Sequence, residues 1–230
     1  MPIAKTVGIR ECEVKFALYG QETLLKFQSI LLNNHFIAAP EQLETDFLPD
    51  TEDFLCRQNN LLLRFRQVRN ETKDDILLSL KIGKTNKKGF QDARELEYYF
   101  SNINYDIFKA INTILEQTTK HTLPETIHSF QDLRQLQSFL GIISFPALRI
   151  FIEKKRTQYS KGTNHVTFDT FPKDIGTYLE IETRTPEELD YMIALLQLPK
   201  DQLELRDYGD IVKDAQRELP ESQRRTALFH

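Results

Sequence analysis

Three pairs of glutamates, each pair separated by one residue, are the features of this 230-residue sequence best suited to chemistry. The pairs are Glu11 with Glu13, Glu95 with Glu97, and Glu180 with Glu182. Each pair lies in a segment where apolar and charged residues alternate, so both carboxylates face the same side of a strand. Like charges this close are destabilising unless a cation compensates them. Carboxylate oxygens suit Mg²⁺ and Mn²⁺, so the pairs indicate a site for one of these ions.

Basic residues recur in the same alternating pattern. They are Lys15, Arg64, Arg66, Lys81, Lys154 and Arg156. Together these cations can neutralise a ligand that carries roughly four or five negative charges, and guanidinium and ammonium groups suit phosphate oxygens. We therefore expect a small, highly phosphorylated ligand.

Short segments with a period of two carry these charges, and such segments predict strands. They span residues 11–18, 44–48, 61–68, 76–82, 93–100, 147–159, 164–171 and 176–183. In the first, Cys12, Val14 and Phe16 occupy one face, and Glu13 and Lys15 occupy the other. Apolar residues at helical spacing predict a helix over 21–33 and further helices between 105 and 140.

The alternation has two interpretations. An antiparallel sheet with one face on a core and the other in water is the commonest source of such a pattern. The polar faces here carry mostly full charges, with few Thr, Gln or Asn residues, and this favours a ligand-binding interior. If some eight antiparallel strands close into a barrel, the charges would line an interior tunnel. The apolar face of the barrel would lie outward, beneath the helices.

The chain has no repeat, low-complexity tract or Pro/Gly-rich linker that would divide it, so we expect a single domain over residues 1–230. A helical insertion is expected at about 105–127 and a C-terminal helical segment at 186–218. Thr185, Pro186 and Glu188 are typical of the start of a helix, as N-cap, first helical residue and capping-box partner.

The composition excludes several classes of protein. A net charge of -4 and a pI of about 5.8 argue against a nucleic-acid-binding surface. The longest apolar runs fall far short of the roughly 20 residues of a membrane-spanning helix, and the N-terminal residues lack a secretory pattern. Cys12 and Cys56 offer neither a disulfide framework nor zinc-ligand spacing. We expect a cytoplasmic protein that binds neither nucleic acid nor membrane.

The order of the motifs resembles the CYTH family, also called triphosphate tunnel metalloenzymes. This family includes class IV adenylyl cyclases, thiamine triphosphatases and inorganic tripolyphosphatases. The resemblance begins at Glu11-Cys12-Glu13-Val14-Lys15, which is similar to the Glu-x-Glu-x-Lys signature of the family. It continues through Leu63-Arg64-Phe65-Arg66, Leu80-Lys81, Arg94-Glu95-Leu96-Glu97, Lys154-Lys155-Arg156 with Tyr159, Asp169, and Leu179-Glu180-Ile181-Glu182, and it ends near Arg206-Asp207-Tyr208.

The resemblance implies an α+β fold, in which a closed eight-stranded antiparallel β-barrel forms a tunnel with a polar, charged lumen and the helices pack outside. It also implies roles for individual residues. Lys15, Arg64, Arg66, Lys81, Lys154 and Arg156 would bind the triphosphate, and with Glu11 and Glu13 they would form the catalytic set. Glu11, Glu13, Asp169, Glu180 and Glu182 would hold Mg²⁺ or Mn²⁺. Glu95 and Glu97 would orient the cations from across the tunnel or bind a second metal ion. The helical insertion departs from the usual pattern of the family. The resemblance therefore does not predict the structure of the tunnel mouth or whether the chain forms a homodimer.

Three functions fit the resemblance. Attack by water on the terminal phosphorus would make the chain a triphosphatase acting on an inorganic, thiamine or nucleoside triphosphate. Attack by a ribose 3'-hydroxyl on the α-phosphorus would make it a class IV adenylyl cyclase, which forms cyclic AMP and pyrophosphate. A non-catalytic triphosphate or polyphosphate sensor is the third. We favour hydrolysis, because cyclisation also requires a base-recognising pocket that the sequence does not reveal.

Overall fold

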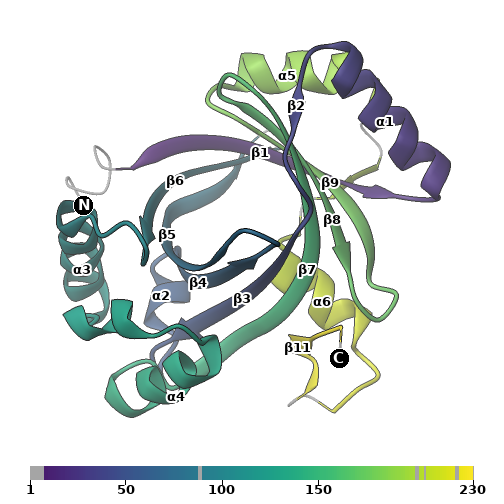
Figure 1. The fold of residues 1–230 in the computed structure, drawn as a ribbon. Coiled ribbons are helices and arrows are strands. Elements are labelled where there is room, and N and C mark those ends of the chain that lie inside the picture. The colour runs from purple at the N-terminus through teal and green to yellow at the C-terminus, as the bar shows by residue number, and fades with distance from the viewer. Residues whose placement is uncertain (1–7, 88–89, 200–201, 205, 221–222, 230) are drawn as a thin grey trace.

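Eight antiparallel strands close into a barrel (Figure 1). The computed structural model describes residues 8–87, 90–199, 202–204, 206–220 and 223–229. The strands are β1 (Ile9–Leu18), β3 (Gln42–Asp50), β4 (Leu61–Arg69), β5 (Asp74–Lys87), β6 (Phe90–Tyr99), β7 (Ala147–Lys161), β8 (Asn164–Phe171) and β9 (Gly176–Thr183). They are paired in the order β1-β6-β5-β4-β3-β7-β8-β9, and β9 pairs with β1 to complete the circle. The predicted α+β fold and its closed barrel are confirmed.

Short strands lie at the margins of the barrel. β2 (Ile37–Ala38) and β11 (Thr226–Ala227) both pair with β7, and β10 (Leu203–Glu204) pairs with β1. The register between β3 and β7 shifts between Leu48 and Pro49, where the proline has no N–H to donate to the ladder. The sheet therefore bends at the end of β3.

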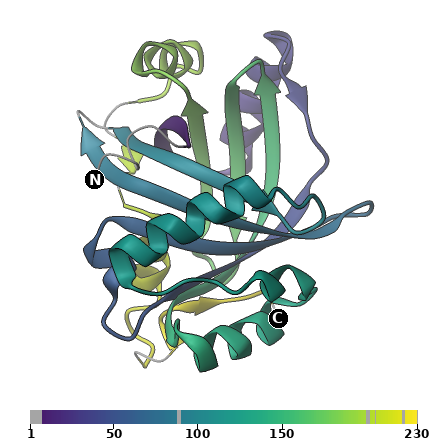
Figure 2. The same ribbon diagram turned by 90° about the vertical axis from the view of Figure 1, so that its left-hand side faces the viewer.

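Helices cover the outward face of the barrel with apolar side chains. α2 (Leu55–Gln58), α3 (Tyr105–Thr119), the 3₁₀ helix η2 (Glu125–Ser129) and α4 (Leu133–Ile143) contribute to one cluster, in which Leu63 and Leu78 pack with Ile111 and Leu136. Figure 2 shows α3 and α4 lying across this side. α1 (Gln21–Asn33) and α5 (Pro186–Leu195) form a second cluster over β1, β8 and β9.

α6 (Tyr208–Ala215) has a different position, because it packs on residues that face the inside of the barrel. Ile150 and Ile152 share the face of β7 that carries Lys154, and they form a third cluster with Ile211 and Val212 of α6. One end of the barrel is therefore covered by a helix (Figure 1). We call it the Tyr208 end, and we call the opposite end, where β9 finishes, the Glu182 end.

The two expected helical segments are present with different bounds. The insertion at 105–127 consists of α3 followed by η2, which ends at Ser129. The C-terminal segment at 186–218 is not one helical run, because β10 pairs with β1 between α5 and α6. The capping box of Thr185 and Glu188 is confirmed. Among the described helices, none has the length and apolar character needed to cross a bilayer.

Adjacent leucines on β4 offer a test of this inside-out arrangement. Leu63 is fully buried in the outer core, whereas Leu62 faces the interior cavity. We expect Leu63→Ala to lower the free energy of unfolding by about 3 kcal/mol, because it opens a cavity in packed apolar surface. Leu62→Ala is the matched control, with an expected loss below about 1 kcal/mol. Equal losses in urea denaturation would contradict the assignment of faces.

Candidate functional site

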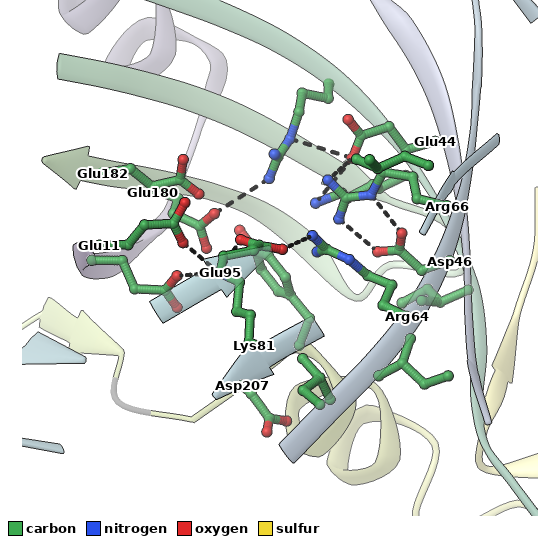
Figure 3. Close-up of a pocket in the computed structure, with 18 of the residues that line it drawn as sticks. Glu11, Glu44, Asp46, Arg64, Arg66, Lys81, Glu95, Glu180, Glu182 and Asp207 are labelled. Atoms are coloured by element: carbon green, nitrogen blue, oxygen red, sulfur yellow. Dashed lines mark hydrogen bonds and ion pairs between the residues drawn. The ribbon is translucent and has the colours of Figure 1, made fainter. Parts of the chain in front are cut away.

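A cavity of about 530 Å³ occupies the barrel and is lined by the inward-facing side chains. Every site residue predicted from the sequence lines it except Asp169, which is buried against two of the others. Two groups of side chains face one another across the cavity (Figure 3). One contains Glu11 and Glu182, and the other contains Arg66 with Glu44 and Asp46.

The basic wall consists of Arg64, Arg66, Lys154 and Arg156, from β4 and β7. Arg66 donates two hydrogen bonds to Asp46, at 2.6 and 2.9 Å, and its Nη1 lies 3.0 Å from Glu44. Such bidentate pairing holds the guanidinium plane in one orientation. The same arginine is buried, so its side chain is fixed before any ligand arrives.

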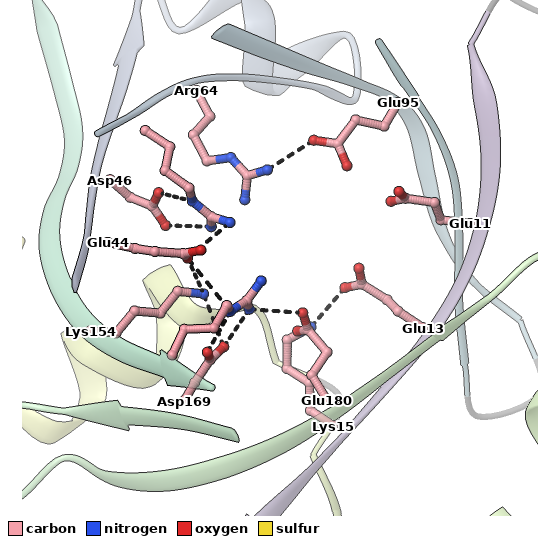
Figure 4. Close-up of polar contacts among 12 residues, drawn as sticks. Glu11, Glu13, Lys15, Glu44, Asp46, Arg64, Glu95, Lys154, Asp169 and Glu180 are labelled. Atoms are coloured by element: carbon pink, nitrogen blue, oxygen red, sulfur yellow. Dashed lines mark hydrogen bonds and ion pairs between the residues drawn. The ribbon is translucent and has the colours of Figure 1, made fainter. Parts of the chain in front are cut away.

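Asp169 holds the other half of the basic wall. It accepts hydrogen bonds from Arg156 at 2.5 and 2.6 Å and from Lys154 at 2.9 Å (Figure 4). It is completely buried, and although burial opposes ionisation, Arg156 and Lys154 lower its pKa below the usual range. Asp169 is therefore ionised and belongs structurally to the basic wall.

The acidic cluster consists of Glu13, Glu180 and Glu182. One carboxylate oxygen from each lies within 4.8 Å of the others. The pairing of β1 with β9 creates this proximity, because it sets Glu13 opposite Glu182 and Lys15 opposite Glu180. Glu11 is the next inward-facing residue of β1 and lines the same cavity.

Two lysines neutralise part of the acidic side. Lys15 lies 2.7 Å from Glu13 and 2.9 Å from Glu180, and Lys81 lies 3.0 Å from Glu13 and 3.1 Å from Glu11. Burial opposes the charge of each lysine, but these carboxylates raise the pKa of both lysines above the ordinary value. Both cations are therefore fully charged.

The remaining carboxylates of this side are not fully compensated. Burial raises the pKa of Glu11 to about 7, with a further contribution from Glu95 and an opposing one from Lys81. Burial and the nearby charges of Glu180 and Glu11 raise the pKa of Glu182 well above its usual value. Glu180 behaves oppositely, because Lys15 and Arg156 outweigh burial and lower its pKa. The pKa of a carboxylate on this side is therefore raised where burial and neighbouring carboxylates outweigh the nearby cations.

This donor set fits a hard divalent cation. Three carboxylate oxygens converge without nitrogen or sulfur donors, which is the ligand chemistry of Mg²⁺ or Mn²⁺. A dication would also supply the positive charge that Glu182 and Glu11 lack. The residues that could hold it are Glu13, Glu180 and Glu182, with Glu11 adjacent.

The other two predicted carboxylates diverge. Glu95 lies 2.9 Å from Arg64 and 3.4 Å from Lys81, so it contacts cations as one of the two predicted roles requires. These cations lower its pKa to about 2 against the effect of burial. Glu97 is exposed in the cavity and makes no hydrogen bond or ion pair with any residue that the structure describes.

Glu44 and Asp46 of β3 are site residues that the sequence reasoning did not select. Both are buried and contact the basic wall, and Glu44 lies 3.4 Å from Lys154 as well as beside Arg66. A signal was available, since Glu44 and Asp46 alternate with Leu43, Thr45 and Phe47 as the other inward residues do. The sequence predicts a strand over residues 44–48, and the parity of that strand puts both carboxylates on its polar face.

Tyr208 closes the Tyr208 end over the cations. Its ring centroid lies 5.1 Å from the Lys15 ammonium and 4.8 Å from that of Lys154, within the range of cation–π attraction. The ring also packs on Phe171, with centroids 4.7 Å apart. The motif Arg206-Asp207-Tyr208 thus places an aromatic ring at this end of the barrel, beside two lysines that are predicted to bind phosphate.

Solved structures share this architecture. A protein from Pyrococcus horikoshii is 18% identical with a TM-score of 0.61, and the match covers 89% of this chain and 98% of that chain. A proposed adenylate cyclase from Vibrio parahaemolyticus is 17% identical with a TM-score of 0.60, over the same shares of the two chains. A proposed adenylyl cyclase from Hippeastrum, described as having a dominant triphosphatase activity, is 15% identical with a TM-score of 0.54, over 93% and 99%.

No protein-family model matches the sequence, and neither does any curated protein. The structural likenesses, at these identities, show the fold. They confirm at that level the resemblance to CYTH tunnel proteins drawn from the motifs.

Removing the charge of Asp169 tests the pairing in the basic wall. Asp169→Asn leaves Lys154 and Arg156 buried beside a neutral amide, so we expect a loss of about 3 kcal/mol in the free energy of unfolding, measured with urea. Glu204→Gln is the control, because it neutralises one of the two carboxylates that pair with the partly exposed Arg206, with an expected loss below about 1 kcal/mol. A small loss for Asp169→Asn would show that the pair is not needed for stability.

Glu182 should oppose folding of the metal-free protein once it ionises. Its folded pKa is raised, so the native state binds more protons than the unfolded state above about pH 4.3, and stability falls as the pH rises towards the folded pKa. We expect Glu182→Gln to raise the melting temperature by about 3 °C at alkaline pH and to weaken its pH dependence. The exposed Glu22→Gln should change neither, and a lower melting temperature for Glu182→Gln would contradict the argument.

Proposed function

We propose that the tunnel binds a triphosphate compound and cleaves a phosphoanhydride bond by metal-dependent hydrolysis. The observation that carries this proposal is the opposition of the acidic cluster and the basic wall across one cavity. Phosphate oxygens require cationic donors, and hydrolysis of a phosphoanhydride at neutral pH benefits from a divalent ion beside the reacting phosphorus. The basic wall offers the cationic donors, and the acidic cluster offers ligands for the divalent ion.

The basic wall would bind the phosphate chain without rearrangement. Arg66 and Arg156 are buried and held by Asp46 and Asp169, so their orientation is set in the free protein. Preorganised donors stabilise developing negative charge more strongly than mobile ones, because no reorganisation accompanies the reaction. Lys15 and Lys81 would extend the cradle to the acidic side.

The acidic cluster would hold Mg²⁺ or Mn²⁺ through Glu13, Glu180 and Glu182. When bound, such an ion neutralises phosphate oxygens and lowers the pKa of a coordinated water. Glu11 lines the cavity beside these three ligands and could accept a proton from the attacking water. We assign Asp169 to positioning Lys154 and Arg156, not to the metal.

Adenylyl cyclase activity is the second candidate. The Vibrio protein is named for it, whereas the Hippeastrum protein is described by its triphosphatase activity. The shared fold supports both reactions, and the choice depends on whether water or a ribose hydroxyl is the nucleophile.

Product analysis with site variants tests the proposal. We expect the purified protein to release orthophosphate from tripolyphosphate, thiamine triphosphate or ATP with Mg²⁺ or Mn²⁺. Glu13→Ala and Glu182→Ala should lower turnover by at least 100-fold while retaining triphosphate binding, because they remove metal ligands and leave the basic wall intact. Arg66→Ala should weaken binding as well as turnover.

The exposed Glu22→Gln is the control and should retain full activity. Formation of cyclic AMP and pyrophosphate from ATP would contradict hydrolysis and support adenylyl cyclase activity. Tight binding without turnover of any triphosphate would identify a sensor. Full metal-dependent turnover in both glutamate variants would remove the metal assignment.

A further inference from the structure

The hydroxyl of Tyr208 is a buried polar group at one end of the charged lumen. Tyr208 is the first residue of α6 and lines the cavity. The residue as a whole is partly exposed, but its hydroxyl oxygen is buried and makes no hydrogen bond of ordinary geometry with any residue that the structure describes. A buried donor without an acceptor destabilises a protein, so this hydroxyl calls for a functional explanation.

The ring of Tyr208 is held beside Asp169. Its centroid lies 4.7 Å from that of Phe171 and 5.9 Å from that of Tyr178. Phe171 follows Asp169 by two residues on the same face of β8, and Tyr178 lies opposite Asp169 in the pairing of β8 with β9. The two aromatic neighbours therefore fix the tyrosine next to this carboxylate.

The surroundings keep the Tyr208 hydroxyl protonated. Burial raises the pKa of Tyr208 well above its ordinary value, and the charges of Asp169 and Glu180 raise it further, with Arg156 opposing them. The group is therefore a neutral O–H. Its proton can turn about the C–O bond towards an acceptor without movement of the ring.

Asp169 is the carboxylate that a bound triphosphate would deprive of donors. It is completely buried, and it accepts two hydrogen bonds from Arg156 and one, at 2.9 Å, from Lys154 (Figure 4). Both cations belong to the basic wall, so a phosphate chain and Asp169 would share them. A buried carboxylate that shares its cations with another anion needs a further donor to remain ionised in place.

Lys154 is the more weakly held of the two cations. Its ammonium makes one hydrogen bond to Asp169, whereas the guanidinium of Arg156 makes two. Burial and the nearby charge of Arg156 lower the pKa of Lys154, so the negative charge of a phosphate would stabilise this ammonium. The Tyr208 ring, with its centroid 4.8 Å from the ammonium, lies directly beside the pair that the phosphate would divide.

We propose that Tyr208 is a positioning residue, whose hydroxyl donates a hydrogen bond to Asp169 when a triphosphate engages Lys154 and Arg156. The inference rests on the proposed function and adds a residue to it. The added hydrogen bond replaces the part of the compensation that the phosphate takes from Asp169. The carboxylate then keeps its place and continues to hold Arg156, so the basic wall retains its geometry around the ligand.

Binding and unfolding of one variant test the inference together. Tyr208→Phe keeps the ring and its packing and removes only the hydroxyl. We expect tripolyphosphate to bind about tenfold more weakly, because Asp169 then lacks the replacement donor. Calorimetry with Ca²⁺ in place of Mg²⁺, and product analysis to confirm intact ligand, would measure this change. The melting temperature of the ligand-free variant should be unchanged or slightly higher, because the hydroxyl has no hydrogen bond to lose there.

Tyr98→Phe is the matched control. The hydroxyl of Tyr98 is also buried without a hydrogen bond to a described residue, but it lies in the outer apolar cluster. This variant should leave the affinity for tripolyphosphate unchanged. Unchanged affinity in Tyr208→Phe, or equal weakening in Tyr98→Phe, would overturn the inference and leave the proposed function standing. Failure of the wild-type protein to bind any triphosphate would instead overturn the proposed function and this inference with it.

Removal of Lys154 supplies a second test, which needs no ligand. Lys154→Met takes one of the two cations from Asp169, so the Tyr208 hydroxyl should become a needed donor in the free protein. We expect Tyr208→Phe to lower the melting temperature by about 3 °C in this background and not in the wild type. The absence of a loss in the Lys154→Met background would overturn the inference, and weaker tripolyphosphate binding in Tyr208→Phe would then indicate direct contact between the hydroxyl and phosphate.

Discussion

The pairing of buried charges inside the barrel is the constraint on which the rest of the structure depends. Buried ions cost several kcal/mol each unless a partner compensates them. Each of the six cations predicted from the sequence has a carboxylate within 3.1 Å, as the Lys15–Glu13 and Arg64–Glu95 pairs illustrate. These six cations and their carboxylate partners, which we call the charged belt, form a network in which the acids fix the bases before a ligand binds. A ligand must compete with these carboxylates or arrive with positive charge of its own.

Filling the interior with charge forces the hydrophobic core outward. The charged part of the lumen contributes little net stability, because desolvation of the ions offsets their attraction. Most of the apolar core therefore lies on the outward face, beneath helices that have apolar stripes of their own. Leu63 and Phe65 of β4 lie between Arg64 and Arg66, and they are completely buried beneath this cover. The same alternation thus produces both the site and the core. The tunnel therefore depends on the helices beyond residue 100, because they cover the apolar outward face of its strands.

Strand parity explains why so much of this arrangement could be predicted. A period of two assigns each side chain to a face without knowledge of the tertiary structure, so Glu13, Arg64 and Glu180 could be placed together in one lumen. The same parity places Glu44 and Asp46 on the inward face, but it does not give their partners, since Lys154 lies on β7, which is adjacent to β3 only through long-range pairing. The position of Asp169 depends on such pairing too, since its register opposite Arg156 draws it to the basic wall.

Negative charge within the belt is concentrated on one side of the tunnel. Eight carboxylates lie among the six cations of the belt, and the excess is concentrated where Glu11 and Glu182 retain protons. The basic wall, by contrast, is neutralised by fully ionised acids such as Asp46 and Asp169. A dication at the acidic cluster would replace protons there and compete with Lys15 and Arg156 for Glu180, whereas Asp46 and Asp169 would stay paired with the basic wall. Metal and phosphate can therefore enter one cavity as a complex, with the metal directed to the side that lacks positive charge.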